Sequence, residues 1–227
     1  MRSVAKGFPR RLAETLQAKD EQENAWETLD TLVASVNEHD TFTGGHSERV
    51  ARLARDLARL LGYSPAEQEF IRQAGLVHDV GKVSIPEPVL RKRGSLTDEE
   101  LHLVRLHPIM GASILSRMPG MDRLVTVVLH HHEHWDGSGY PSGLKEVEIP
   151  VESRIVAIVD AFDAMTAGSP GRPAIRTEDA LAELRRCSGS QFDPLLVDAM
   201  HEAYRNGLLD DTPGAIVLPE SGWSMSL

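Results

Sequence analysis

The feature that most constrains this chain is a set of seven potential metal ligands that lie far apart in the sequence. At its centre is the run His78-Asp79-Val80-Gly81-Lys82. Imidazole and carboxylate groups hold divalent metals, and seven of them are enough for two ions that share a bridging carboxylate. We therefore expect a fold that brings these residues together as a two-metal hydrolytic site: His46, His78, Asp79, His107, His131, His132 and Asp160.

Length and composition indicate one globular domain with short terminal extensions. The chain has 227 residues, of which 41% are hydrophobic, so it can bury one sizeable core. We expect an N-terminal extension and helix over 1–35, a metal-binding domain over 36–206 and a C-terminal tail over 207–227.

Charge and hydropathy exclude several classes of partner. The formal net charge of -10 argues against nucleic-acid and anionic-membrane surfaces, because both require basic patches. No apolar run is long enough for a signal peptide or a membrane span, so we expect a cytoplasmic protein. The lone Cys187 excludes an intramolecular disulfide and makes a thiolate metal site improbable.

The spacing of apolar residues predicts an all-α fold. No stretch shows sustained two-residue alternation, and Ser64 and Thr97 each begin a capping box that is completed three residues later by a glutamate. The first predicted helix, over 13–38, is interpreted as packing against the body or a dimer mate rather than as a signalling coil. Further helices are expected over 47–61, from 65 to about 79, from 97 to 107, before the pair His131-His132, over 155–162, over 177–186 and over 194–204.

The histidine and aspartate pattern indicates phosphoester or phosphodiester hydrolysis. If Asp79 bridges, one ion takes His46, His78 and Asp160, and the other takes His107, His131 and His132. Two ions about 3.5 to 4 Å apart can hold a bridging hydroxide and stabilise both the attacking and the leaving oxygen of an in-line displacement. Lys82 follows His78 by four residues, so we expect it on the same helical face, next to a substrate phosphate.

Each histidine alone is more often a surface or core residue than a ligand, but the group reverses those odds. We assign no ligand role to His39, His102, His130, His134 and His201. The segment 133–141 must end a helix, because Gly137, Gly139 and Pro141 cannot sustain one. An ordinary tight loop is one reading, and we favour a loop that walls the metal site.

Taken in order, these motifs resemble the HD-GYP domain, a subgroup of the HD superfamily of metal-dependent phosphohydrolases. His78-Asp79 resembles the HD of the name and Gly139-Tyr140-Pro141 the GYP, and the resemblance covers roughly residues 33–204. It implies an all-helical domain with a bimetallic or trimetallic centre, often of iron or manganese. It also implies hydrolysis of the bacterial messenger cyclic di-GMP to pGpG and sometimes to GMP.

The resemblance also implies roles for individual residues. The family's metal ligands fall on the seven residues named above, and its phosphate-contacting lysine falls on Lys82. Phe42 occupies the position of a glutamate found in trinuclear members, so we expect a binuclear centre. We expect catalytic roles for Asp79 and Lys82, and substrate contacts from Lys82, Asp163, Arg172, Gly139 and Tyr140.

One segment departs from the family pattern. Where the family commonly reads Thr-Ser-Asp-Arg-Pro-Tyr-Arg, this chain reads Thr-Ala-Gly-Ser-Pro-Gly-Arg over 166–172. Ser169 cannot replace a guanidinium group, whereas Arg172 keeps the second basic position. Two alternatives to a cyclic di-GMP phosphodiesterase therefore stay open: hydrolysis of another cyclic or linear nucleotide, and a non-catalytic cyclic-dinucleotide receptor or interaction module.

The expected cofactors are two divalent metal ions. Iron or manganese follows from the resemblance, and the ligand types also allow zinc or cobalt. The expected partner is cyclic di-GMP or a related nucleotide. A homodimer or a signalling-protein partner stays open, and neither nucleic acid nor a membrane is expected.

Overall fold

The structure, a computed structural model, describes residues 24–36, 45–92, 94–168 and 173–207, and these ranges are helical with no β-strand. The all-α prediction is confirmed. In chain order after the helix over 24–36 come α2 (His46–Leu60), α3 (Pro65–Val77), the 3-10 helix η1 (Val80–Ser84), α4 (Glu87–Leu90), α5 (Asp98–Arg105), α6 (His107–Leu115), α7 (Asp122–His130), the 3-10 helix η2 (Glu146–Glu148), α8 (Val151–Ala167), α9 (Thr177–Arg186) and α10 (Pro194–Arg205).

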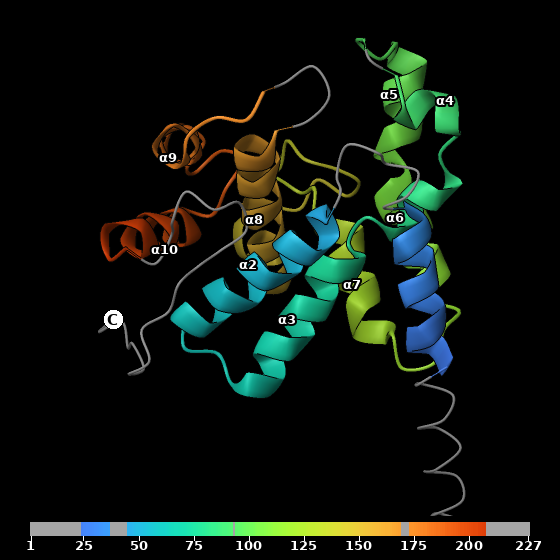
Figure 1. Cartoon of the computed structure of the whole chain (residues 1–227), viewed down its shortest axis with the longest axis horizontal. Helices are drawn as coiled ribbons and strands as arrows, with labels where there is room; N and C mark the ends of the chain where they lie inside the picture. Colours follow the sequence, from blue (N-terminus) through green and yellow to red (C-terminus); the bar gives the residue numbers. More distant parts are fainter. Residues whose placement is uncertain (1–23, 37–44, 93, 169–172, 208–227) are drawn as a thin grey trace, which may run out of the picture.

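Helices α2, α3, α7 and α8 form the centre of the molecule (Figure 1). In this view α9 and α10 lie on one side of them, and α4, α5 and the helix over 24–36 lie on the other. Helices α2 and α3 pack so closely that a Cβ on Gly75 would lie 3.0 Å from the Cα of Ala51. The buried core is continuous through this centre, with Leu53, Leu57 and Ile158 fully buried in it.

Local sequence signals set the ends of several helices. The Ser64 side chain accepts the backbone N–H of Glu67, and the Glu67 carboxylate accepts the N–H of Ser64, which completes the predicted capping box. Thr97 and Glu100 form the same arrangement at the start of α5. Helix α2 ends at Leu60, and Gly62 follows its cap with a φ of 80°, the left-handed conformation that glycine adopts without steric cost.

The helix over 24–36 packs against the body of the protein. Ala25, Leu29 and Val33 are buried and belong to the same hydrophobic core as the central helices. This agrees with the predicted packing role, although residues 13–23 and 37–38 of the predicted helix lie outside the described residues. Most of the predicted N-terminal extension and almost all of the predicted C-terminal tail lie outside them as well.

The prediction that Lys82 continues the helical face of His78 is wrong. Helix α3 ends at Val77, His78 is its C-terminal cap, and the chain then turns into η1, which carries Lys82. The short helix α4 was not predicted either.

Within the described residues, no helix combines the length and the apolar character needed to cross a membrane.

Candidate metal centre

The seven predicted ligands converge where several helix ends meet. His46 is the first residue of α2, His78 and Asp79 follow α3, and His107 is the first residue of α6. His131 and His132 follow α7 directly, and Asp160 lies within α8. Helix ends suit this arrangement because neighbouring side chains there can turn toward the same point, which two adjacent residues inside a helix cannot do.

Asp79 lies between two groups of ligand-type side chains. Its Oδ1 lies 3.2 Å from Nε2 of His107, and its Oδ2 lies 3.3 Å from Nε2 of His78. Among the described residues, the two groups whose ligand atoms lie within 4.8 Å of one another are Asp79 with His107, His131 and His132, and Asp79 with His46 and His78. One carboxylate therefore faces two places where a metal ion can be held.

Asp160 closes the second group from α8. Its Oδ1 lies 3.1 Å from Nε2 of His46 and 3.8 Å from Nε2 of His78. Asp160 therefore lies on the side of His46 and His78.

Hydrogen bonds fix the orientation of four of the imidazole rings. The Nδ1–H of His46 donates to Oδ2 of Asp163 at 2.7 Å. In three others the Nδ1–H donates to the carbonyl oxygen three residues earlier: His78 to Gly75 at 2.7 Å, His107 to Val104 at 2.8 Å and His131 to Val128 at 2.7 Å. Because a carbonyl oxygen can only accept, in these three rings Nδ1 carries a proton and Nε2 is the nitrogen that faces the centre.

The inward-facing nitrogens fit a bound cation. Nε2 of His78 is buried and has no hydrogen-bond partner. Nε2 of His107 faces Nε2 of His131 at 3.2 Å, and both are acceptors in the tautomer described above. Nitrogen ligands lie about 2 Å from a metal such as zinc, so two ligands of one ion are separated by about 3 Å. A bound metal ion would accept the lone pairs of these inward-facing nitrogens, which otherwise have no proton between them.

The electrostatics of the centre suit cation binding at neutral pH. Burial lowers the pKa of His132 to about 4 and holds that of His131 well below its usual value, so both rings are neutral at pH 7. Burial raises the pKa of Asp79, but Lys82 and His78 outweigh this and hold it well below the usual range. Asp160, hydrogen-bonded to His46, has its pKa lowered to about 2 in spite of burial.

Asp163 lies behind His46. Its carboxylate is fully buried, accepts the Nδ1–H of His46 and accepts from Arg49, with Nε of Arg49 at 2.7 Å from Oδ1 and Nη2 at 3.0 Å from Oδ2. The expected substrate contact of Asp163 stays a prediction, and in this structure both of its oxygens are engaged by His46 and Arg49. It is a positioning residue for His46.

Lys82 reaches the centre from η1. Its Nζ lies 2.6 Å from Oδ2 of Asp79. The 3-10 helix η1 packs closely against the start of α6. A Cβ on Gly81 would overlap the backbone oxygen of His107. Gly81 therefore allows Asp79 and Lys82 to lie beside the residues that begin α6.

The loop after α7 forms one wall of the centre, as we favoured from the sequence. The Tyr140 ring stacks on His132 with centroids 5.0 Å apart. Burial, and next the charge of Asp79, raise the pKa of Tyr140 to about 12, so the phenol stays protonated. Gly139 allows the loop to pass close to the main chain at His134, because a Cβ on Gly139 would overlap the backbone nitrogen of His134.

Two supporting residues had no role in the sequence reasoning. Arg49 holds Asp163, as described above. Glu133 is buried, and its carboxylate accepts backbone N–H groups of the loop that follows Pro141, those of Ser142, Gly143 and Leu144. Arg49 lies three residues after His46, and Glu133 directly follows His132. The sequence signal that points to Glu133 is a carboxylate beside a glycine-rich loop.

Some predicted residues lie outside the described part of the chain, among them Arg172, Ser169, Phe42 and His39. The other histidines to which we gave no ligand role are absent from both ligand groups found within the described residues. His134 pairs with the Ser138 hydroxyl, and His201 with the carbonyl of Leu181.

A comparison with protein families identifies the family of this chain. The HD domain family matches residues 30–196, which is most of the chain. This chain belongs to the HD domain family.

The predicted resemblance is confirmed by curated relatives that are named as cyclic-dinucleotide phosphodiesterases. The chain is 38% identical over 200 residues to the cyclic di-GMP phosphodiesterase response regulator RpfG of Xanthomonas campestris, covering 86% of this chain and 52% of that protein. It is 40% identical over 176 residues to a cyclic di-GMP phosphodiesterase of Thermotoga maritima, covering 77% and 48%. It is 37% identical over 185 residues to the 3'3'-cGAMP-specific phosphodiesterase 2 of Vibrio cholerae, covering 81% and 35%. The chain thus spans about half or less of the length of these relatives.

Solved structures show the same fold. The HD domain described here matches Bd1817, an HDG"Y"P protein from Bdellovibrio bacteriovorus, with a TM-score of 0.59 and 19% identity over 89% of this chain and 75% of that one. It matches the cyclic GMP-AMP specific phosphodiesterase V-cGAP3 of V. cholerae with a TM-score of 0.58 and 19% identity over 78% of this chain and 49% of that one.

Proposed function

We propose that this HD domain is a metal-dependent phosphodiesterase that hydrolyses a cyclic dinucleotide, with cyclic di-GMP as its first substrate and pGpG or GMP as its product. The observation that carries the proposal is the position of Asp79 between two groups of inward-facing ligands, with Lys82 beside it. Relatives named as cyclic di-GMP phosphodiesterases support the choice of substrate.

We infer that two divalent ions are held at this centre. His46, His78 and Asp160 would hold one ion, His107, His131 and His132 the other, and Asp79 would bridge them. When bound, such ions stabilise charge on phosphoryl oxygens and make water a better nucleophile near neutral pH. The resemblance favours iron or manganese, and the ligand types are also compatible with zinc and cobalt.

The remaining roles fall to side chains on the rim. Lys82 supplies a positive charge next to the ligands, where it can donate to a phosphate oxygen of the substrate. Tyr140 offers a protonated phenol and an aromatic face beside His132. The guanidinium of Arg105 lies 5.6 Å from the centroid of Tyr140 and adds a second cation on this side. These groups can bind and orient an anionic nucleotide.

A second candidate substrate is 3'3'-cGAMP. Relatives from V. cholerae that are 37% and 35% identical to this chain are named as 3'3'-cGAMP-specific phosphodiesterases. The departure over 166–172 removes the first arginine of the usual family pattern. It therefore leaves open whether the second base of the cyclic dinucleotide is guanine or adenine.

The test is a substrate panel on protein purified without oxygen and loaded separately with iron, manganese or zinc. Cyclic di-GMP, 3'3'-cGAMP and linear pGpG are incubated with each sample, products are separated by chromatography, and metal content is measured. We expect close to two metals per chain and turnover of at least one cyclic dinucleotide. The double variant His78→Ala/Asp79→Ala should abolish turnover.

Two results would contradict the proposal. Full activity in the double variant would remove the centre from the reaction. Tight nucleotide binding by fully metal-loaded protein, with no product after long incubation, would indicate a receptor instead of an enzyme.

A further inference from the structure

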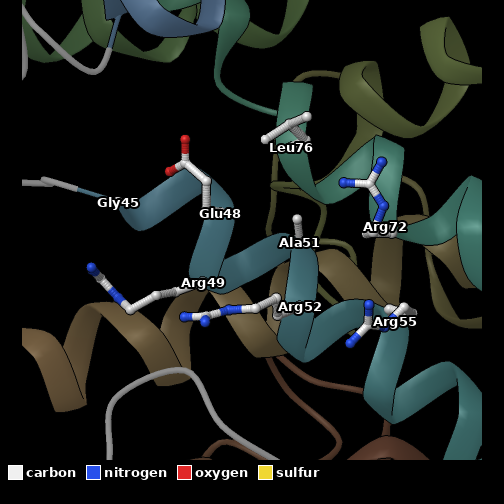
Figure 2. A pocket seen from close by; sticks show the side chains of 8 residues that line it. All are labelled: Gly45, Glu48, Arg49, Ala51, Arg52, Arg55, Arg72 and Leu76. Carbon is white, nitrogen blue, oxygen red and sulfur yellow. The ribbon is translucent and has the colours of Figure 1, made fainter. Parts of the chain in front are cut away.

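A separate groove between α2 and α3 is lined by arginines. It is a shallow groove, largely open to solvent, with a volume of about 550 Å³, and its lining includes Arg49, Arg52, Arg55 and Arg72 together with Glu48 and Leu76. Figure 2 shows Arg49, Arg52 and Arg55 on successive turns of α2, with Arg72 and Leu76 on α3. None of the predicted metal ligands lines this groove.

The arginines stand out against the overall charge of the chain, which is -10. Arg49, Arg52 and Arg55 follow one another at intervals of three residues, so they cover about 9 Å along the axis of α2. This spacing suits an anion that carries charge at more than one point, because a single phosphate cannot reach all of these side chains. Glu48 is the one acidic residue among the described residues that line the groove.

Carboxylates hold three of the guanidinium groups from outside the groove lining. The nearest nitrogen–oxygen distances are 2.7 Å for Arg49 with Asp163, 3.1 Å for Arg55 with Asp56 and 2.8 Å for Arg72 with Glu69. A guanidinium has five N–H donors, so each of these pairs orients the group and leaves donors for a ligand. Within the described residues, Arg52 has no carboxylate at ion-pair distance. Binding here therefore relies on directed N–H donors more than on net charge.

We propose that this groove binds a small anion with at least two phosphate groups, such as a nucleoside diphosphate. The volume lies within the range of about 300 to 1,000 Å³ that small-molecule sites occupy. The partly exposed Leu76 is an apolar part of the lining against which a sugar or base can pack. The groove is separate from the phosphodiesterase centre, and the proposal stands or falls independently of that reaction.

One residue connects the groove to the metal centre. Arg49 lines the groove and also holds Asp163, which accepts the Nδ1–H of His46. A phosphate that draws on Arg49 competes with Asp163 for the same guanidinium. Arg49 is therefore unsuitable for a clean test, because it supports both sites.

The test uses calorimetric titration of the full chain, freed of metal by a chelator, with inorganic pyrophosphate and with GDP at low salt. We expect saturable binding of one ligand per chain that weakens as salt is raised. The double variant Arg52→Gln/Arg55→Gln should bind about tenfold more weakly or worse, since each lost charged hydrogen bond contributes on that scale. Arg59→Gln, an exposed arginine of α2 outside the groove lining, is the matched control and should bind as the unaltered chain does.

Glu48→Gln separates a binding effect from a folding effect. This change removes the negative charge from the groove, so it should tighten binding, which partial unfolding cannot do. Thermal melting of all variants accompanies the titrations.

Four results would overturn the proposal. The first is no saturable binding of either probe, and the second is equal affinity in the Arg52→Gln/Arg55→Gln variant. The third is binding that survives in that variant but disappears in His78→Ala/Asp79→Ala, because it would place the anion at the metal centre. The fourth is binding of a polyglutamate peptide without binding of the phosphate probes, because it would make the groove a docking surface for an acidic protein segment.

Discussion

Asp163 shows how a single buried carboxylate can serve a centre that it does not enter. It fixes the ring of His46 through Nδ1 and is itself held by two nitrogens of Arg49. Partners of this kind set the tautomer and direction of a metal-binding imidazole, and their loss commonly lowers metal affinity by about 10- to 100-fold.

We predict that Asp163→Asn weakens metal binding by roughly 10- to 100-fold while the protein still folds. The amide keeps the shape of the side chain but loses the charge that holds Arg49 and His46. Competition against a chelator of known affinity measures the effect. Asp198→Asn, which disrupts an exposed pair with Arg185, is the control and should leave metal affinity unchanged. Equal metal affinities in the two variants would contradict the positioning role.

The pKa shifts within the centre predict how metal-free protein responds to pH. Burial lowers the pKa of His132 to about 4. Burial also lowers the pKa of His46, but its bonds to Asp160 and Asp163 outweigh this and raise it to about 10. A histidine in the unfolded chain has a pKa of about 6.5.

Between about pH 4 and 6.5 the unfolded chain binds a proton at His132 that the folded chain does not, so stability falls as pH falls. Between about pH 6.5 and 10 folded His46 keeps a proton that the unfolded chain has lost, so stability falls as pH rises. We therefore predict greatest stability near pH 6.5, measured by urea unfolding in the presence of a chelator. His132→Gln should flatten the acidic limb and spare the alkaline one, and an unchanged acidic limb would refute this assignment.

At the scale of elements, the turn of η1 against α6 determines the geometry between the two ligand groups. Gly81 lies so close to the backbone of His107 and Gly111 that a side chain cannot be added without moving the main chain. Asp79 and Lys82 flank this contact, so a shift there changes both the bridging carboxylate and the neighbouring cation.

Gly81→Ala should accordingly destabilise the protein by about 1 to 3 kcal/mol, the usual range for overpacking, and reduce metal content. Urea unfolding and elemental analysis measure the two effects. Gly94→Ala is the matched control, because a Cβ at Gly94 meets nothing within 4 Å. A stable, fully loaded Gly81→Ala protein would show that α6 can move away without consequence for the centre.

The helix ends show which structural features can be predicted from sequence. Ser64 and Thr97 carry their capping partners three residues away, so the starts of α3 and α5 could be read locally. The turn after His78 could not, because it depends on packing against α6. The contact of each Nδ1 with the carbonyl three residues earlier is a local pattern that the sequence reasoning missed.

At the scale of the whole molecule, the convergence of ligands from α2, α3, α6, α7 and α8 was predicted from residue types and family resemblance. The burial of Asp163 was not, since it depends on Arg49 of α2 lying beside α8, more than a hundred residues away. Such contacts between distant elements carry no local signal. For the same reason the roles of Arg49 and Glu133 became visible only in three dimensions.

Metal removal should lower the stability of the entire domain. A ligand that binds only the folded state and is present at 100 times its dissociation constant stabilises that state by about 2.7 kcal/mol, which corresponds to roughly 5 to 10 °C in Tm for a domain of this size. We predict a fall of that order when a chelator is added, measured by scanning calorimetry. The His78→Ala/Asp79→Ala variant should show no chelator effect. An equal fall in that variant would indicate that the stabilising metal lies elsewhere.

The spread of ligands along the chain also bears on the order in which the site is completed during synthesis. The group made of Asp79, His107, His131 and His132 is fully translated once residue 132 has been added. Asp160 and its neighbour Asp163, which orients His46, are added later with α8. Chains fold from the N-terminus as they emerge, so a nascent chain holds one complete set of ligands before it holds the other. If these residues hold two ions as proposed, the first set is available to a metal ion before the second.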